Sequence, residues 1–291
     1  MFGIPGRFET YHAMYSSRAL AILVAFAAVT SSSFAQNWQG RGRRIPNRDE
    51  YPNWTIEEPF ADDVFTFARI QYDSQSSFGR GFGRGGGRGW MNDYPSSDWN
   101  FSFRLKQVTS LQVDPNGRVL RFTDADIFDY PFLYMNGVGA LYLSEPEAQA
   151  LRRYLQNGGF LMVDDFWGDW EWQVVMEQLA KAVPEWQPRE IPLQHEIFHA
   201  VYDLPRRPQV PSIRSWRSGQ TYEDHGPGSE TGPNYQGLFD EQGRLAVLLC
   251  HNNDIGDGWE EERSDPEYFN NYALKWSYPL GLNIVSYALS H

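Results

Sequence analysis

The sequence contains few residues of several informative kinds. Its single cysteine, Cys250, cannot form a disulfide within the chain and excludes a CxxC redox or zinc motif. Its lysines are only Lys106, Lys181 and Lys275, so arginine carries nearly all of the positive charge. With a formal net charge of -12, the protein is a poor partner for nucleic acid, because phosphates are bound through Lys and Arg. We therefore exclude nucleic acid as a ligand.

Long hydrophobic runs are also scarce. The apolar run from Ala19 to Val29 is about half of the roughly 20 residues that a membrane-spanning helix needs. Arginines precede it, and Ser33-Phe34-Ala35 follows it with small residues at the two positions that a signal peptidase inspects. We expect residues 1–35 to be a signal peptide that is cleaved after Ala35. An exported protein without disulfides fits a bacterial periplasm or a secreted protein with a large core.

The composition after this segment predicts one folded domain. The chain has 291 residues, of which 41% are hydrophobic and 16% aromatic, which is ample material for a core. Residues 36–60 are rich in Arg, Pro, Asn and Gly and are expected to be a linker, followed by a single α/β domain over 61–291. The Gly/Arg-rich tract at 74–89 is expected to be a mobile loop within that domain.

The most informative stretch is residues 157–167. Gly158-Gly159 suits the left-handed turn that ends a helix, and Phe160 to Val163 suits a strand buried on both faces. Asp164 and Asp165 follow where that strand ends. In open α/β sheets, ligands bind outside the carboxyl ends of the strands, so these two carboxylates are the first candidates for a site.

The remaining patterns predict alternating strands and helices, hence a doubly wound, mostly parallel sheet. A capping box, Ser144-x-x-Glu147, begins the helix that ends at Gly158. Residues 184–235 have frequent proline and little periodicity, so they are predicted to be an irregular loop. The other predicted elements are strands at 65–72, 131–135, 140–143 and 245–250, a hairpin of 109–113 with 119–122, and helices at 96–108, 172–182 and from Pro279.

Polar residues gather in three groups where such a sheet would expose its strand ends. The first is Asp164 with Asp165, the second His195 with His199, and the third His251 with Asp254, Asp257 and Glu260. Carboxylates and imidazoles of this kind serve as acids, bases or metal ligands. We take as catalytic candidates Asp164, Asp165 and His195. We take as binding candidates His199, His251, Asp257, Trp259, Tyr94 and Asp98.

Several motifs have a competing structural explanation. His195-Glu196-Ile197-Phe198-His199 has the spacing of a zinc-protease helix, but Pro192 and Pro205 bound it closely and no apolar helical stripe runs through it. Cys250 next to His251 suggests a nucleophile pair, but adjacent strand residues point to opposite faces, which favours a buried core cysteine. The segment 253–260 is similar to a calcium loop but departs from the EF-hand spacing. We assign no metal ligand, and the cofactor is unknown.

Five motifs in one order resemble a known family. Together the segments 94–101, 130–135, 158–166, 195–199 and 256–260 resemble the bacterial domain-of-unknown-function family 4159, from about Val64 to the C-terminus. The resemblance implies a flavodoxin-like fold similar to class I glutamine amidotransferases, in exported or membrane-associated bacterial proteins. It does not imply the amidotransferase reaction, which needs a cysteine on a G-x-C-x-G elbow, because the elbow after Val163 carries Asp164 and Asp165.

The sequence therefore leaves three functional hypotheses open. The first is a non-catalytic periplasmic module that binds a small ligand or a protein partner. The second is a hydrolase, metal-assisted or not, that uses Asp164 or Asp165 with His195, His199 or His251. The third is a structural subunit that docks through its Arg-rich arm, in association with membrane-bound bacterial complexes.

Overall fold

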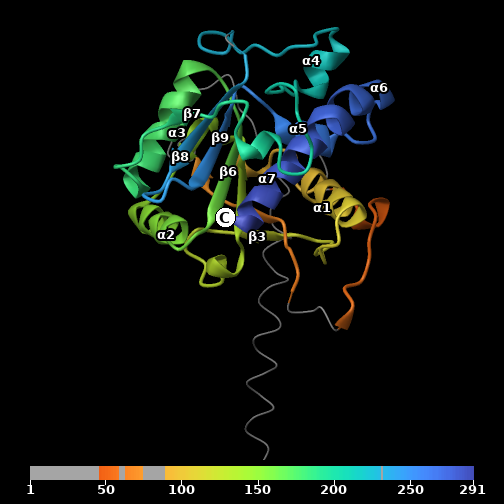
Figure 1. The fold of residues 1–291 in the computed structure, drawn as a ribbon. Helices are drawn as coiled ribbons and strands as arrows, with labels where there is room; N and C mark the ends of the chain where they lie inside the picture. Colours follow the sequence, from red (N-terminus) through yellow and green to blue (C-terminus); the bar gives the residue numbers. More distant parts are fainter. Residues whose placement is uncertain (1–45, 59–62, 75–88, 231) are drawn as a thin grey trace, which may run out of the picture. The chain divides into compact units, whose positions relative to one another are not determined.

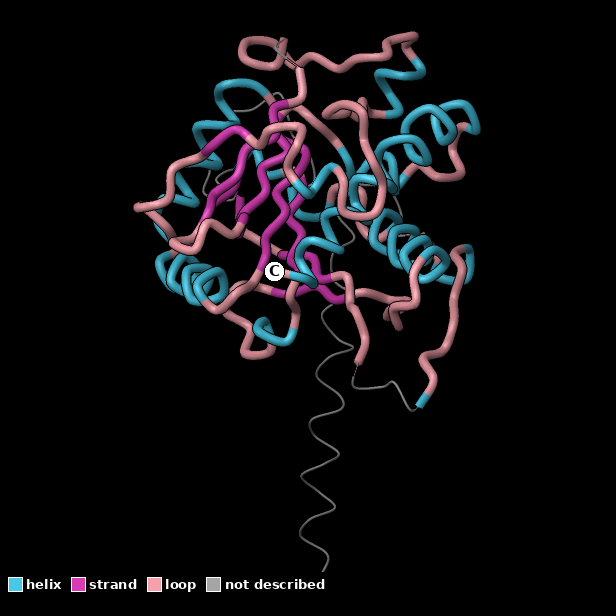
Figure 2. Tube along the Cα trace, in the orientation of Figure 1, coloured by secondary structure: helices cyan, strands magenta, loops and turns pink. Residues whose placement is uncertain are grey.

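Two layers of helices enclose a central sheet (Figures 1 and 2). The structure, a computed structural model, describes residues 46–58, 63–74, 89–230 and 232–291, all of which belong to one compact unit, Ile45–His291. The expected signal peptide, much of the linker and almost all of the Gly/Arg-rich tract lie outside the described residues. In the part of the chain that is described, every helix is too short or too polar to cross a bilayer.

The main sheet has seven strands in the order β3-β1-β4-β6-β9-β8-β7. Its strands are β1 (Ala68–Ile70), β3 (Arg118–Leu120), β4 (Phe132–Asn136), β6 (Phe160–Phe166), β7 (Arg189–Glu190), β8 (Asn234–Phe239) and β9 (Leu245–His251). The five strands from β3 to β9 pair in parallel, and β8 is antiparallel to both of its neighbours. A second, two-stranded sheet pairs β2 (Asp73–Ser74) with β5 (Leu141–Tyr142). The prediction of an α/β fold with a mostly parallel sheet is confirmed.

Helices cover both faces of this sheet. The α-helices are α1 (Ser96–Val108), α2 (Glu145–Gln156), α3 (Gly168–Ala182), α4 (Ile213–Arg217), α5 (Ile255–Glu260), α6 (Pro266–Tyr268) and α7 (Tyr278–Ser290). The 3-10 turns are η1 (Arg48–Glu50), η4 (Gly89–Met91), η5 (Ile127–Asp129), η6 (Val138–Ala140) and η7 (Glu196–Phe198), and η8 (Phe269–Ser277) is a π-helix. Helices α2 and α3 lie on one face, and α1, α5 and α7 lie on the other (Figure 1).

The alternation of strand side chains explains the two layers. In β4, Phe132 and Tyr134 pack into the core with α1, α5 and α7, whereas Leu133 and Met135 pack into the core with α2 and α3. Because successive strand residues point to opposite faces, a strand between two helical layers is expected to be apolar at nearly every position. All five residues of β4 are buried, and only Asp165 of the seven in β6 is half-buried.

Several predicted elements differ from the structure. The segments 109–113 and 119–122 do not form a hairpin, because Val113 and β3 both pair in parallel with the chain around β1. The first strand is shorter than predicted, with only Ala68–Ile70 in the ladder. The segment 184–235 is less irregular than predicted: its described residues include β7, η7, α4 and the start of β8, and side-chain bonds from Asn253 hold the backbone at Val210 and Pro208. The capping box at Ser144 and the left-handed Gly158, at φ 98°, are as predicted.

Candidate functional site

The carboxyl ends of the parallel strands carry a concentration of polar residues. Asn136 ends β4, Asp164 and Asp165 lie near the end of β6, and His251 ends β9. The chain passes from β1 to β3 on one side and then crosses to β4 on the other, so β1 and β4 flank a switch in strand order. Ligands of open α/β sheets bind at such a switch point, at the carboxyl edge. This edge is therefore the candidate site.

Unusual backbone conformations mark the same edge. Among the described residues, the non-glycine residues with positive φ are Asp93 (60°), Asp165 (52°) and Asn252 (58°). Asp165 lies between Val163 and Phe166, where the pairing of β6 with β9 shifts register. Left-handed backbone is tolerated best by Asn and Asp and persists only where its surroundings enforce it, most often at functional sites.

Asp164 is fully buried and only partly hydrogen-bonded. Its Oδ2 accepts from the Gly256 N–H at 2.9 Å and from the Tyr134 hydroxyl at 3.0 Å, whereas its Oδ1 has no hydrogen-bond partner. Burial raises the pKa of Asp164 to about 8, although the bond from Gly256 favours the charged form. Asp164 thus ties β6 to the start of α5, and its burial favours the protonated form.

Asp165 is half-buried and is held at both oxygens. Its Oδ2 accepts from the Asn92 side-chain amide at 2.7 Å and its Oδ1 from the Trp167 indole N–H at 2.8 Å. Burial and the nearby charge of Asp93 raise the pKa of Asp165 to about 7. Within the described segments, no hydrogen bond to this carboxylate caps the following helix α3, and its two partners are side chains from different segments.

A second group of acids lies beside Asp164. Asp93 accepts at Oδ2 from the Asn136 amide at 2.6 Å, and one carboxylate oxygen from each of Asp93, Asp257 and Glu260 lies within 4.8 Å of the others. Burial and the charge of Glu260 raise the pKa of Asp93 to about 8. The pKa of Asp257 is also raised by burial and by Asp93. The turn before α1, the end of β4 and the helix α5 therefore converge here.

The asparagines after β9 have a structural function. Asn253 accepts from the Val210 N–H at 2.8 Å and donates to the Pro208 carbonyl at 3.0 Å. Asn252 accepts from the Gly168 N–H at 2.8 Å, and Asp254 caps α5 through the Asp257 N–H at 2.9 Å. These bonds tie residues 208–210 and the start of α3 to the end of β9.

A stacked pair continues the acidic edge on the other side of Asp165. The Trp167 and His225 rings stack with centroids 4.3 Å apart, and His225 Nε2 lies 2.7 Å from the Glu223 carboxylate. Burial alone lowers the pKa of His225, but Glu223 more than offsets it, so the pKa is raised. Glu171 accepts from the Trp167 N–H at 2.7 Å, and burial raises its pKa to about 7.

The histidines of the second predicted group lie far from these acids. The His195 ring contacts Phe239, with centroids 6.2 Å apart, and Phe239 pairs with Leu245 at the first residue of β9. Asp164 and Asp165 lie level with the other end of β9, about 20 Å along the strand at roughly 3.3 Å per residue.

Both histidines already have local partners. His195 Nδ1 accepts from the Ile197 N–H, and His199 donates to the Leu193 carbonyl at 2.6 Å and pairs with Asp203. The segment that holds them is a 3-10 turn rather than a zinc-protease helix. The structure does not bring His195 or His199 together with Asp164 or Asp165.

Five other candidate residues are engaged in packing or hydrogen bonding. His251 is buried and donates to the Gly168 carbonyl at 3.0 Å. Asp98 is buried in an ion pair with Arg69, and Trp259 is fully buried in the core. Tyr94 is half-buried beside the Arg69 guanidinium. Cys250 is fully buried, which raises the pKa of its thiol and disfavours the nucleophilic thiolate.

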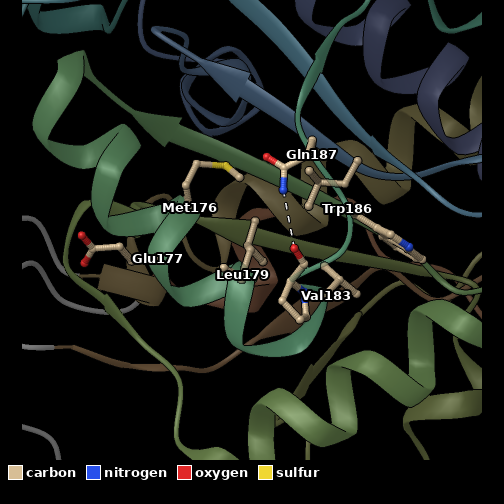
Figure 3. A pocket seen from close by; sticks show the side chains of 9 residues that line it. Met176, Glu177, Leu179, Val183, Trp186 and Gln187 are labelled. Atoms are coloured by element: carbon tan, nitrogen blue, oxygen red, sulfur yellow. Dashed lines mark hydrogen bonds between the residues drawn. The ribbon is translucent and has the colours of Figure 1, made fainter.

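An apolar hollow lies at the other end of α3. It has a volume of about 280 Å³ and is lined mainly by Met176, Leu179, Val183, Trp186 and Leu238 (Figure 3). Its only charged lining residue, Glu177, is exposed and points away from the hollow (Figure 3). A hollow without converging polar groups offers little to orient a ligand. The acidic edge remains the better candidate.

Sequence reasoning did not identify four residues of this site. Asp93 and Asn136 belong to segments that the sequence places 43 positions apart, and His225 and Glu223 lie in the stretch predicted to be irregular. Only Asn136 could have been found from the sequence, because it is the polar residue that directly follows the predicted apolar strand 131–135.

Comparison with known proteins defines the family. No curated protein matches the chain. The model of the family described as "Domain of unknown function (DUF4159)" matches residues 66–289, which include every strand of the central sheet and all of the acids described above. The match confirms the resemblance found in the five sequence motifs. This chain belongs to the DUF4159 family.

Proposed function

We propose that this protein is an exported, non-catalytic binding module that takes a positively charged group at the carboxyl edge of its sheet. The observation that carries the proposal is the convergence of Asp93, Asp164, Asp165 and Asp257 at the strand switch point. Burial raises the pKa of each of these carboxyls because it disfavours their charged forms, and a cationic ligand would stabilise those forms. Arg69, whose charge lowers the pKa of Asp93, is already paired with Asp98.

The strand order supports a flavodoxin-like fold similar to class I glutamine amidotransferases. Numbered along the chain, the five parallel strands lie in the order 2-1-3-4-5, which is the flavodoxin-like order. Asp165, which is left-handed near the end of the central strand β6, corresponds to the position where an amidotransferase-like elbow would carry its nucleophile. A carboxylate held by Asn92 and Trp167 favours binding over acyl transfer.

A hydrolase is the second candidate, and one observation favours it. The pKa values of about 8 for Asp164 and about 7 for Asp165 lie near neutrality, where a general acid or base is most effective. His195 and His199 are too far away to assist, so such an enzyme would rely on its carboxylates and a bound metal ion.

Asp165→Asn should weaken the binding of a cationic probe about tenfold, the effect of losing roughly 1.4 kcal/mol of interaction. We would titrate spermidine and N-acetyl-arginine amide into the protein by calorimetry. Asp129→Asn serves as the matched control, because Asp129 is exposed on η5. Equal binding by both variants, or no binding by the wild type, would reject the proposal.

The same variants discriminate the hydrolase. Turnover of ester or phosphoester substrates that Asp165→Asn abolishes and Asp129→Asn leaves intact would establish catalysis and replace the binding proposal. Turnover that neither variant changes would be assigned to a contaminant.

A further inference from the structure

The cluster of Asp93, Asp257 and Glu260 has the geometry of a cation site. Their ligand oxygens lie within 4.8 Å of one another. Opposite oxygens around Ca²⁺, at 2.3–2.6 Å from the ion, are separated by about 4.6–5.2 Å, and around Mg²⁺ by about 4.0–4.2 Å. Three oxygens that lie within 4.8 Å of one another can surround a single ion of this kind. Ca²⁺ accepts irregular coordination, whereas Mg²⁺ demands near-ideal octahedral geometry, so a cluster drawn from separate segments favours calcium.

A buried amide provides a second, independent observation. Asn136 is fully buried, and its Nδ2 donates to Asp93 Oδ2 at 2.6 Å, so the amide points into the cluster. Its Oδ1 has no hydrogen-bond partner. A buried polar atom without a partner is rare and calls for an explanation such as an ion. An amide carbonyl oxygen is a common calcium ligand, and it would complete a set of four protein oxygens.

We propose that Asp93, Asp257, Glu260 and the amide oxygen of Asn136 bind a hard divalent cation of the size of calcium. The inference deepens the proposed binding function, since the ion would occupy the same edge of the sheet. Its four ligands do not include Asp165, the residue at which binding of an organic cation is tested above.

The donor set selects the class of ion. All four donors are oxygens, and no Cys or His belongs to the cluster. Zinc and copper prefer nitrogen and sulfur ligands, whereas calcium, magnesium and manganese prefer carboxylates and carbonyls. Gly256 permits the close approach of α5, because a Cβ at this position would lie 2.7 Å from Asp93 Oδ2 and 2.9 Å from Asn136 Nδ2.

The charge of the cluster makes an ion favourable. Asp93 and Asp257 are 5% and 6% exposed, and their carboxylates lie close to that of Glu260, so negative charges would be held together with little solvent around them. A bound divalent cation would attract all of these carboxylates and offset their mutual repulsion. Its direct coordination would also replace the water that the carboxylates lose on burial. Glu260 is half-buried, which leaves the cluster accessible from one side.

Calcium binding tests the inference directly. We would treat the purified protein with EGTA and titrate it with CaCl2, MgCl2 or MnCl2 by calorimetry, and then measure thermal unfolding. We expect one calcium ion per chain, weaker binding of magnesium, and a rise of about 5 °C in the melting temperature at saturating calcium. No heat and no stabilisation with any of the three ions at 10 mM, a concentration of roughly ten times the weakest extracellular calcium affinities, would overturn the inference.

A matched pair of variants locates the ion. Glu260→Gln should weaken calcium binding at least about tenfold, whereas Glu267→Gln, an exposed acid of α6, should leave it unchanged. If Glu260→Gln does not fold, Glu260→Asp retains the charge but withdraws the oxygen by one methylene, and it should weaken binding likewise. Calcium binding that survives both Glu260 variants would place the ion elsewhere and overturn the assignment.

The two proposals fail separately. If calcium does not bind but spermidine binds in a manner that depends on Asp165, only the cation site is wrong. If calcium binds through Glu260 but no organic cation binds, the cation site stands and the binding function of the Asp165 side is wrong.

Discussion

Arg69→Ala should lower the free energy of unfolding by about 3–5 kcal/mol and the melting temperature by roughly 10 °C. Arg69 is fully buried in β1, and its Nη2 lies 2.5 Å from Asp98 Oδ1. Removal of one partner of a buried ion pair leaves the other charge buried without compensation, which costs more than the pair itself contributes.

The guanidinium of Arg69 also orders the turn that precedes α1. Its Nη1 donates to the carbonyls of Trp90 and Asn92, each at 3.1 Å, and its Nη2 donates to the Ser97 hydroxyl at 2.8 Å. The guanidinium carbon also lies 4.9 Å from the Tyr134 ring centroid. Burial alone lowers the pKa of Arg69, but Asp98 more than offsets this, so the pKa is raised and the charge is permanent.

Thermal and urea denaturation of three variants would check this prediction. Arg118→Ala breaks an ion pair with Asp126 in which both side chains are exposed, at 52% and 38%, and it should cost less than about 1 kcal/mol. The double variant Arg69→Met with Asp98→Leu should recover part of the loss, because neither charge of this ion pair is left buried without its partner. A loss for Arg69→Ala no larger than that for Arg118→Ala would contradict the prediction.

The turn that Arg69 stabilises also positions residues of the candidate site. The turn that it holds through Asn92 also presents Asp93 to the acidic cluster and the Asn92 amide to Asp165. A variant that loosens this turn should therefore weaken cation binding even though Arg69 touches no proposed ligand. This residue is a positioning residue for the site.

The sequence predicted the centre of the fold well because local and global preferences agree there. The capping box at Ser144, the left-handed Gly158 and the apolar strand after it are all local patterns, and the structure has each of them. In an α/β fold, a strand that is buried on both faces has to lie in the interior of the sheet. The position of Asp164 and Asp165 at its carboxyl end followed from the same pattern.

The errors arose where tertiary contacts override local patterns. Asp114-Pro115-Asn116-Gly117 is turn chemistry, and it predicted a hairpin, but β3 continues in parallel with β1 instead. No helix was predicted over residues 255–260, which contain two glycines, but they form α5 because Asp254 caps the helix and Gly256 packs against Tyr134. Neither contact is visible in the sequence.

The candidate site was only half predictable for a similar reason. Asp164 and Asp165 follow an apolar strand, but Asp93 follows a glycine-rich tract and reaches the edge only through a left-handed turn held by buried Arg69. The pattern H-E-x-x-H drew attention to His195 and His199, which the topology places at the opposite end of β9. Spacing along the chain does not report which end of a strand a loop faces.

Glu171→Gln should remove part of the pH dependence of stability and stabilise the protein at alkaline pH. Burial raises the pKa of Glu171 from 4.5 to about 7, with a further increase from Asp165 and an opposing effect of His225. The folded state therefore binds this proton more tightly than the unfolded state does. The resulting stability is complete below pH 4.5 and is lost as the pH rises through 7, by up to about 3 kcal/mol for a shift of this size.

Thermal unfolding between pH 4.5 and 8.5 measures this effect. At pH 8 the wild type must bury a carboxylate beside Asp165 and the Tyr72 hydroxyl, whereas glutamine is neutral and its oxygen can still accept from the Trp167 N–H. We expect Glu171→Gln to melt several degrees higher than the wild type at pH 8 and at nearly the same temperature at pH 4.5. Glu177→Gln, at an exposed position of the same helix, should follow the wild type at every pH. An identical pH profile for Glu171→Gln and the wild type would mean that the Glu171 carboxylate is solvated, and the acidic edge would then be more open than its contacts indicate.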